Sequence, residues 1–199
     1  MWVWGCWWTK VLLIENIRAS QINGVLFPGG GQYLDHSTLL NTAKFFLNHA
    51  QTSQDWWPVF GHCQGFEVLL MAITGLDRDS CMTNNTLYKA ENISLPISLT
   101  LDPKQTRWFQ NVEDSVLKTL TTENSTVNNH MWSITPDMFQ KLQGTGLSNY
   151  RILSTTTSPM GKVFVSQFEA INFPLYAMVM TLLKRELFFL TYGFFLKKK

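Results

Sequence analysis

The sequence has few cysteines, few charged residues and no strong excess of one charge. Three of its 199 residues are cysteines, 15% are Asp, Glu, Lys or Arg, and the formal net charge is +2. Three cysteines cannot build a disulfide framework, so the class of small disulfide-stapled domains is excluded. A balanced charge, with a sequence pI of about 8.4, excludes a protein that binds nucleic acid through bulk electrostatics.

The sequence also lacks an apolar run long enough to span a bilayer. The run at Leu187–Leu196 has ten residues, whereas a membrane helix needs about 20. Basic residues stand on both sides of it, at 184–185 and 197–199. We expect no stable membrane span. An interfacial anchor, a buried helix and a non-native tail remain open for this segment.

Signatures of metal and phosphate sites are missing. The cysteines are scattered, and no spacing of His and Cys matches a zinc site. No glycine-rich loop of the G-x-x-x-x-G-K type is present. We therefore expect neither a metal nor an organic cofactor.

Apolar residues make up 45% of the chain, which is enough for the core of one domain. Two short apolar segments, 24–27 and 57–60, each run into a glycine-containing loop and then into a segment with helical spacing. Ser37 or Thr38 can cap the first helix, and the second helix ends at Gly75. Strands and helices in this alternation predict right-handed crossovers and a mainly parallel sheet.

The periodicity weakens between Leu76 and Asn129. In that region a strand-like segment at 95–100 and a helix near 112–120 stand among polar loops. Later apolar segments predict strands at 152–155, 163–170 and 173–180. The last of these contains Pro174, which indicates the start of a strand or an edge strand because proline has no N–H to donate.

Cys63 is the cysteine whose surroundings suit catalysis. It follows a predicted strand, precedes a predicted helix and is flanked by Gly61 and Gly65, the pattern of a nucleophile elbow. Such a turn places the sulfur at the end of the sheet beside a helix N-terminus. We expect the helix terminus to lower the pKa of the thiol and to offer N–H groups to an oxyanion. An inert buried cysteine between loop glycines is the alternative.

The glycine run at 28–31 ends the preceding strand. Backbone N–H groups in such a loop can face a substrate carbonyl. Taken alone the loop is an ordinary tight turn. Because the carboxyl ends of neighbouring parallel strands meet in one crevice, we expect this loop to face Cys63.

Residues 22–30, 57–67 and 168–176 resemble, in order and with matching spacing, the gamma-glutamyl hydrolase family. These are class I glutamine amidotransferase-like hydrolases of folate poly-γ-glutamates. The segment 129–133 resembles the family's central histidine motif. Glutamine amidotransferases in general share the elbow, whereas Glu67 and the histidine motif favour the hydrolase branch.

The resemblance implies an α/β fold, a three-layer sandwich with a flavodoxin-like, mainly parallel sheet. The domain covers residues 22–180, between an atypical segment at 1–21 and an atypical tail at 181–199. The implied substrate is a folyl poly-γ-glutamate, attacked by a thiolate to form a thioester that water cleaves. A homodimer is left open.

The resemblance also implies roles for individual residues. These are a nucleophile (Cys63), oxyanion stabilisers (the backbone of Gly29, Gly30 and Gln64) and substrate-binding side chains (Glu67 and His130). Apart from the resemblance, guanidinium chemistry makes Arg107 or Arg151 a candidate for pairing with substrate carboxylates.

A thiol hydrolase needs a base near the sulfur, usually a histidine. The sequence has four histidines. We interpret His36 and His49 as surface residues, and we expect the side chain of His62 to leave the turn in a direction away from Cys63. His130 is the remaining candidate, yet the resemblance gives it a binding role.

Both ends of the sequence depart from the family. The family's catalytic histidine and glutamate lie in a Trp-His-Pro-Glu motif, and counting from Tyr176 places Thr181 and Leu183 at their positions. Only 21 residues, without a signal peptide, precede Ile22, where the family has a signal peptide, a first strand and a helix. We therefore expect a fold that is incomplete at both ends, an open sheet edge and impaired hydrolysis.

Three N-glycosylation acceptor patterns begin at Asn84, Asn92 and Asn124. They agree with the lysosomal, vacuolar or extracellular location that the resemblance implies. Three alternatives to an impaired hydrolase remain open. They are a non-catalytic pseudoenzyme that binds γ-glutamyl or folate compounds, a membrane-associated protein that uses the Phe-rich tail, and an amidotransferase subunit that needs a synthase partner.

Overall fold

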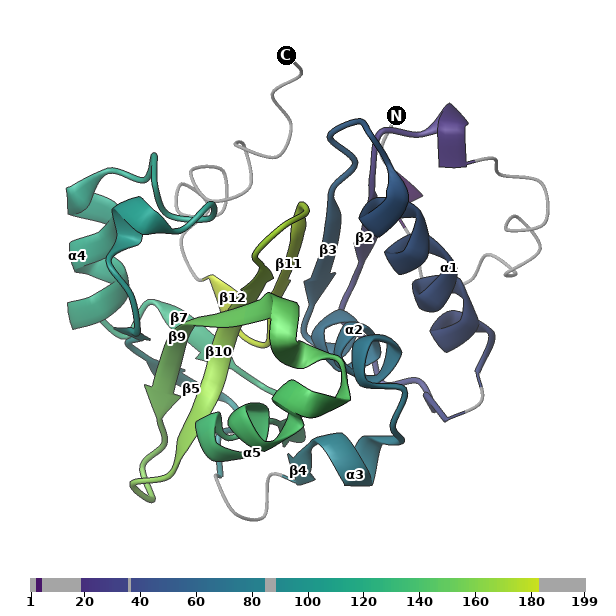
Figure 1. The fold of residues 1–199 in the computed structure, drawn as a ribbon. Coiled ribbons are helices and arrows are strands. Elements are labelled where there is room, and N and C mark those ends of the chain that lie inside the picture. Colours follow the sequence, from purple (N-terminus) through teal and green to yellow (C-terminus); the bar gives the residue numbers. More distant parts are fainter. Residues whose placement is uncertain (1–2, 5–18, 36, 85–88, 183–199) are drawn as a thin grey trace.

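The computed structural model describes residues 3–4, 19–35, 37–84 and 89–182, which form an α/β fold around a seven-stranded sheet (Figure 1). The strands are β1 (Val3–Trp4), β2 (Val25–Phe27), β3 (Val59–His62), β4 (Thr83–Asn84), β5 (Ile93–Leu95), β6 (Ser98–Leu99), β7 (Thr126–Asn128), β8 (Trp132–Ser133), β9 (Tyr150–Thr157), β10 (Val163–Ala170), β11 (Leu175–Met178) and β12 (Thr181–Leu182). The α-helices are α1 (Thr38–Thr52), α2 (Gln64–Thr74), α3 (Arg78–Cys81), α4 (Asp114–Thr122) and α5 (Pro136–Lys141). Short 3₁₀ segments lie at Ala19–Gln21, Pro103–Gln105, Leu142–Thr145 and Leu147–Asn149.

The central sheet is mixed, with the strand order β1-β2-β3-β11-β10-β9-β6. Strands β1, β2, β3 and β11 are parallel. The remaining ladders, from β11 through β10 and β9 to β6, are antiparallel. The predicted parallel arrangement thus holds for the half in which helices connect the strands. The short loops between β9, β10 and β11 admit only hairpins, because a parallel crossover needs a dozen or more residues.

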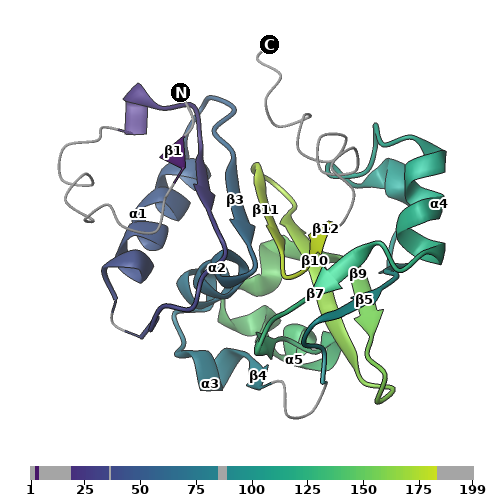
Figure 2. The ribbon, with the colours of Figure 1, turned by 180° about the vertical axis from the view of Figure 1, so that it is seen from behind.

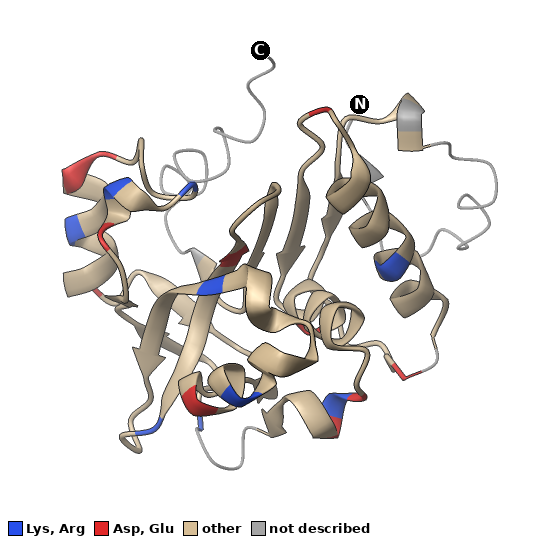
Figure 3. Ribbon diagram, viewed as in Figure 1, with Lys and Arg blue, Asp and Glu red and all other residues tan. Residues whose placement is uncertain are grey.

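Helices cover both faces of this sheet, which confirms the predicted α/β fold class (Figures 1 and 2). Consecutive strand side chains point to opposite faces. Val59 and Ala177 join the core beneath α1, α2 and α5, whereas their neighbours Phe60 and Tyr176 join the core beneath α4. No charged residue lies on β2, β3 or β11, the central strands of the parallel half (Figure 3).

The predicted helix boundaries in the first half of the chain are confirmed. The side chain of Ser37 accepts a hydrogen bond from the N–H of Leu40 at 3.1 Å and caps α1. Gly75 ends α2 in the left-handed conformation, with φ of 72°. The prediction of a single strand at 95–100 is wrong. The strand is interrupted at Pro96, so β5 joins a small sheet with β7 and β12, whereas β6 joins the central sheet.

A strand occupies the place where we expected an open sheet edge. Val3 and Trp4 of β1 pair in parallel with Val25 and Leu26 of β2, so β2 has a neighbour on both sides. The apolar run at 187–196 and Leu183 lie outside the described residues. None of the described helices has the length and apolar character needed to cross a bilayer.

Two glycines let α2 approach β2 and β3 at backbone contact. A Cβ atom on Gly65 would collide with the carbonyl oxygen of Phe27, and a Cβ atom on Gly61 would lie 2.5 Å from the carbonyl oxygen of Gly65. A residue with a side chain would force the helix away from the strands. The position of the first turn of α2 therefore depends on glycine at these two sites.

We expect Gly65→Ala to lower the free energy of unfolding by about 3 kcal/mol, because backbone atoms cannot move aside as a flexible side chain would. Gly144→Ala is the matched control, since nothing lies within 4 Å of the Cβ position at Gly144. Urea denaturation followed by circular dichroism measures both. Equal unfolding midpoints for the two variants would contradict the packing described here.

Candidate active site

Cys63 occupies a strained turn between β3 and α2. Its φ of 53° and ψ of −112° lie outside the regions that residues with side chains favour. Its N–H donates to the carbonyl of Met178 on β11 at 2.8 Å, and its own carbonyl accepts from the N–H of Phe66 at 2.9 Å. Hydrogen bonds on both sides of the turn therefore hold the backbone in a conformation that projects the thiol from the end of β3.

The loop after β2 lies against this thiol, as the sequence predicts. A Cβ atom on Gly29 would lie 3.2 Å from Cβ and 3.6 Å from Sγ of Cys63. The N–H groups of Gly30 and Gln64 both lie within hydrogen-bonding reach of the thiol. Of the three predicted oxyanion residues, Gly30 and Gln64 thus direct N–H groups at the sulfur. Gly29 lies beside the sulfur without an N–H group directed at it among the contacts of the thiol.

The side chain of Gln64 ties this loop to the elbow, a role that the sequence did not reveal. Its Oε1 accepts from the N–H of Gln32 at 3.0 Å, and its Nε2 donates to the carbonyl of Gln32 at 2.6 Å. A Cβ atom on Gly30 would lie 2.6 Å from Oε1 of Gln64. The amide therefore fixes the distance between the loop and the first turn of α2. Only the three-dimensional pairing of residues 32 positions apart could expose this contact.

The thiol does not have the lowered pKa that we predicted. Burial raises the pKa of Cys63 because a thiolate is poorly solvated there. The N–H groups of Gln64 and Gly30 lower it, but the negative charge of Glu67 raises it further, and the net direction is upward. The prediction considered the helix terminus and left out the loss of water and the carboxylate one turn along α2.

Glu67 is buried at the first turn of α2 beneath the thiol. Burial raises the pKa of its carboxyl group to about 7, and the positive charge of Arg78 opposes that rise. The ion pair between Nε of Arg78 and Oε2 of Glu67 spans 3.7 Å, too long for a strong hydrogen bond. The carboxyl group consequently changes charge near neutral pH, close to the sulfur.

A chain of contacts connects Glu67 with His130. The guanidinium of Arg78 lies 5.4 Å above the ring centre of Trp132, and the carbonyl of Trp132 accepts from Nδ1 of His130 at 3.1 Å. His130 is buried, and burial lowers the pKa of its imidazole to about 4. The imidazole is neutral at pH 7, and its Nε2 has no hydrogen-bond partner among the described residues.

The ring of His62 lies near the same loop as the thiol of Cys63. Its Nδ1 lies 3.9 Å from the point that a Cβ on Gly29 would occupy, the same point that lies 3.6 Å from Sγ of Cys63. On its other side, Nε2 is 2.9 Å from Oγ1 of Thr181. Burial lowers the pKa of His62.

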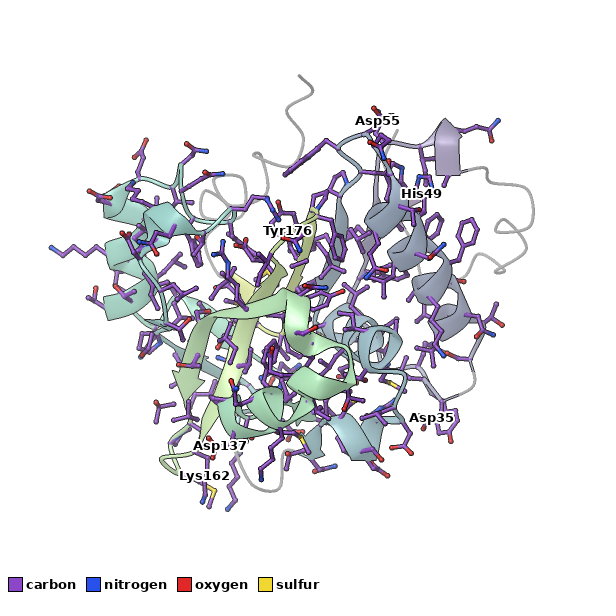
Figure 4. All side chains as sticks on the ribbon, viewed as in Figure 1. Asp35, His49, Asp55, Asp137, Lys162 and Tyr176 are labelled. Carbon is purple, nitrogen blue, oxygen red and sulfur yellow. The ribbon has the colours of Figure 1, made fainter. Side chains whose placement is uncertain are left out.

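His49 lies apart from this site. It stands near the end of α1, with its ring edge-on to Trp57 at a centroid distance of 4.8 Å (Figure 4). His36 lies outside the described residues. Among the described residues no group of three or more His, Cys, Asp or Glu side chains could hold a metal ion.

The two arginines proposed for substrate carboxylates have internal partners. Arg151 forms an ion pair with the fully buried Glu169. Oε1 of Glu169 lies 3.0 Å from Nε and 2.6 Å from Nη2 of Arg151. Arg107 donates from its guanidinium to the carbonyls of Ala170, Ile171 and Phe173. Both guanidinium groups thus hold the end of β10, and neither is arranged to bind a substrate.

The three acceptor asparagines differ in exposure. Asn92 and Asn124 are exposed, whereas Asn84 on β4 is partly buried. Exposure is what attachment of a glycan requires, so two of the three sites are accessible. Glycosylation itself stays a prediction.

Comparison with known proteins confirms the predicted resemblance to gamma-glutamyl hydrolases. It is 37% identical over 163 residues to gamma-glutamyl hydrolase of Rattus norvegicus, which covers 78% of this chain and 48% of that protein. It is 34% identical over 168 residues to the Homo sapiens enzyme (81% and 49%) and 29% identical over 168 residues to gamma-glutamyl hydrolase B of Dictyostelium discoideum (80% and 45%). The chain spans about half the length of the curated relatives it matches. No family model matches the sequence.

A solved structure agrees with the fold. It is a protein from Thermoplasma acidophilum whose description names a GMP synthase, and the likeness covers 90% of this chain and 77% of that one, with a TM-score of 0.52 and 14% identity. At that identity the likeness supports the fold alone. The class I glutamine amidotransferase-like fold predicted from the sequence is confirmed.

We expect Glu67→Gln to change the pH dependence of stability. In wild type the folded carboxyl titrates near pH 7 and the unfolded one near 4.5, so the folded state binds more protons between these values. The stabilisation that the protonated Glu67 gives the folded state is therefore lost as pH rises from 4.5 to 7. Glutamine does not titrate. The stability of the variant relative to wild type should rise by about 2.5 kcal/mol between pH 5 and pH 8.

Urea denaturation of both proteins at pH 5 and pH 8 measures this difference. Asp137→Asn, at an exposed residue on α5, is the control and should leave the difference between the two pH values unchanged. If the free energies of unfolding of wild type and Glu67→Gln differ by the same amount at both pH values, Glu67 titrates as an ordinary surface carboxylate.

Proposed function

We propose that this chain hydrolyses γ-glutamyl bonds in folate poly-γ-glutamates, with Cys63 as the nucleophile. The observation that carries the proposal is the arrangement at the elbow, where one thiol faces the N–H groups of Gly30 and Gln64. The likeness to gamma-glutamyl hydrolases supports the choice of bond. The elbow alone would fit any acyl-transfer reaction of a thiol.

The reaction begins when Sγ of Cys63 attacks the carbonyl carbon of the γ-glutamyl amide. The negative charge then moves to the carbonyl oxygen, where the N–H groups of Gly30 and Gln64 can donate to it. Collapse of this intermediate breaks the C–N bond, and the leaving amine takes up a proton. Water then attacks the thioester, which releases a γ-carboxylate and restores the thiol.

We assign substrate binding to His130, which precedes β8, and to Glu67 on α2. The unpaired Nε2 of His130 can accept a hydrogen bond from a substrate N–H or hydroxyl group, because Nδ1 already carries the donated proton. A buried polar atom without a partner costs stability, which a bound substrate would recover. Glu67 stands beneath the thiol, and its charge can adjust when the site fills.

A location in a lysosome, in a vacuole or outside the cell belongs to the same proposal. It draws on the family resemblance and on the acceptor asparagines, of which Asn92 and Asn124 are exposed. The test uses protein isolated from its own cells and treated with a glycan-removing amidase. A change in mass of the peptides that contain Asn92 and Asn124 would support the proposal.

A second candidate function is binding without turnover. It is favoured by the raised pKa of Cys63, since a protonated thiol is a weak nucleophile. Such a protein would hold a γ-glutamyl compound beside Cys63 without cleaving it. The two candidates differ in one measurable property, the appearance of a shorter product.

The test is incubation of the chain with a pteroyl-polyglutamate and analysis of the products by mass spectrometry. We expect shortened chains from wild type and from Cys81→Ala, because Cys81 is buried and the pKa of its thiol is raised to about 12 by burial. Cys63→Ala should form none, because the nucleophile is removed.

Two results would overturn the hydrolase proposal. One is turnover by Cys63→Ala at the rate of wild type. The other is binding of the polyglutamate by wild type with no product after prolonged incubation, which would establish the second candidate in its place.

A further inference from the structure

The space in front of Gly29 is shared by a thiol and an imidazole. A Cβ atom placed on Gly29 would have three neighbours within 4 Å, namely Cβ and Sγ of Cys63 and Nδ1 of His62. The sulfur and the imidazole nitrogen therefore lie near the same point beside the backbone of Gly29.

The other nitrogen of His62 is held by the turn between β11 and β12. Its Nε2 lies 2.9 Å from Oγ1 of Thr181, and the backbone at Met180 accepts a hydrogen bond from the ring. A hydroxyl can donate or accept, so the contact with Thr181 fits either tautomer of the ring. In the tautomer with hydrogen on Nε2, Nδ1 carries the lone pair and can accept a proton.

We propose that His62 is the general base and acid for Cys63, and that Thr181 is the residue that positions it. The inference rests on the proposed hydrolysis and names the group that moves the proton. It assigns the arrangement of nucleophile, base and orienting group to Cys63, His62 and Thr181, with two of the three members consecutive in the sequence.

The proton moves in a closed cycle. As Sγ bonds to the carbonyl carbon, Nδ1 takes the thiol proton, directly or through one water molecule. It then delivers this proton to the leaving amine as the C–N bond breaks. In the second step Nδ1 takes a proton from the attacking water and returns it to sulfur as the C–S bond breaks.

The charge state of His62 suits a base. Burial lowers the pKa of the imidazole, and the hydrogen bond to the backbone at Met180 opposes this. The titratable group near it is the thiol of Cys63, whose Sγ lies near the same point beside Gly29 as Nδ1 of His62. The turn on its other side contributes the uncharged Met180 and Thr181. His62 is therefore neutral at pH 7, able to accept a proton there.

The experiment compares wild type with His62→Gln, and His49→Gln is the matched control on α1. Removal of a general base should lower kcat by about 10²- to 10⁴-fold with little change in KM. In wild type kcat/KM falls on the acidic side as His62 becomes protonated, below the usual histidine range. This acidic limb should disappear in His62→Gln and persist in His49→Gln.

Thr181→Val and Thr181→Ser test the positioning role. Loss of one hydrogen bond to the imidazole should lower kcat about tenfold in Thr181→Val, and Thr181→Ser should restore it. A merely structural effect of the threonine would appear as a lower unfolding midpoint in both variants, with no difference in the acidic limb.

Alkylation of Cys63 by iodoacetamide gives a readout that does not need turnover. We expect the rate at pH 7 to fall about tenfold in His62→Gln, because less thiolate forms without the base. The buried Cys81 serves as the internal reference in the same peptide analysis. The rate of Cys63 should be unchanged in His49→Gln.

The two measurements separate this inference from the proposed function. If wild type and His62→Gln hydrolyse the polyglutamate at equal rates with equal pH profiles, His62 is not the base and the hydrolase proposal stands. If wild type forms no product yet His62→Gln still slows alkylation, the pairing of His62 with Cys63 stands and the hydrolase proposal fails.

Discussion

The backbone contact between α2 and β2 is the constraint on which the site depends. Gly65 allows the helix to touch the carbonyl of Phe27, and Gly61 allows β3 to touch the helix in turn. With the first turn of α2 held there, Cys63 must take a left-handed φ, and the N–H of Gln64 must face the sulfur. A methyl group at either glycine would displace the thiol and the oxyanion donors together.

Burial opposes the electrostatic effect of the helix terminus at this thiol. The N–H groups of Gly30 and Gln64 favour the thiolate, while the loss of water and the charge of Glu67 disfavour it. The net effect is a raised pKa of Cys63. The same N–H groups are better placed for an oxygen that gains charge during the reaction than for a resting thiolate. A thiol that stays protonated until substrate arrives is also protected against oxidation, which proceeds through the thiolate.

Local patterns in the sequence predicted the elbow well and its electrostatics poorly. The strands and helices around Cys63, the cap at Ser37 and the loop at Gly29 follow from residues close together in the chain. The partners of Arg107 and the raised pKa of Cys63 depend on contacts between distant residues and on exclusion of water. The hydrogen bond between His62 and Thr181 could not be predicted because the two residues are 119 positions apart.

The position of β11 has a consequence for the order in which the protein folds. Strands β9, β10 and β11 form hairpins from neighbouring residues, whereas the ladder between β11 and β3 joins Leu175 to Val59 and Met178 to His62. Contacts across such a sequence separation carry a larger loop-closure entropy and form slowly. His62 and Thr181 are 119 residues apart. The thiol and its surroundings are thus assembled only when the two halves of the chain have met, and a partly folded chain would carry Cys63 as an ordinary cysteine.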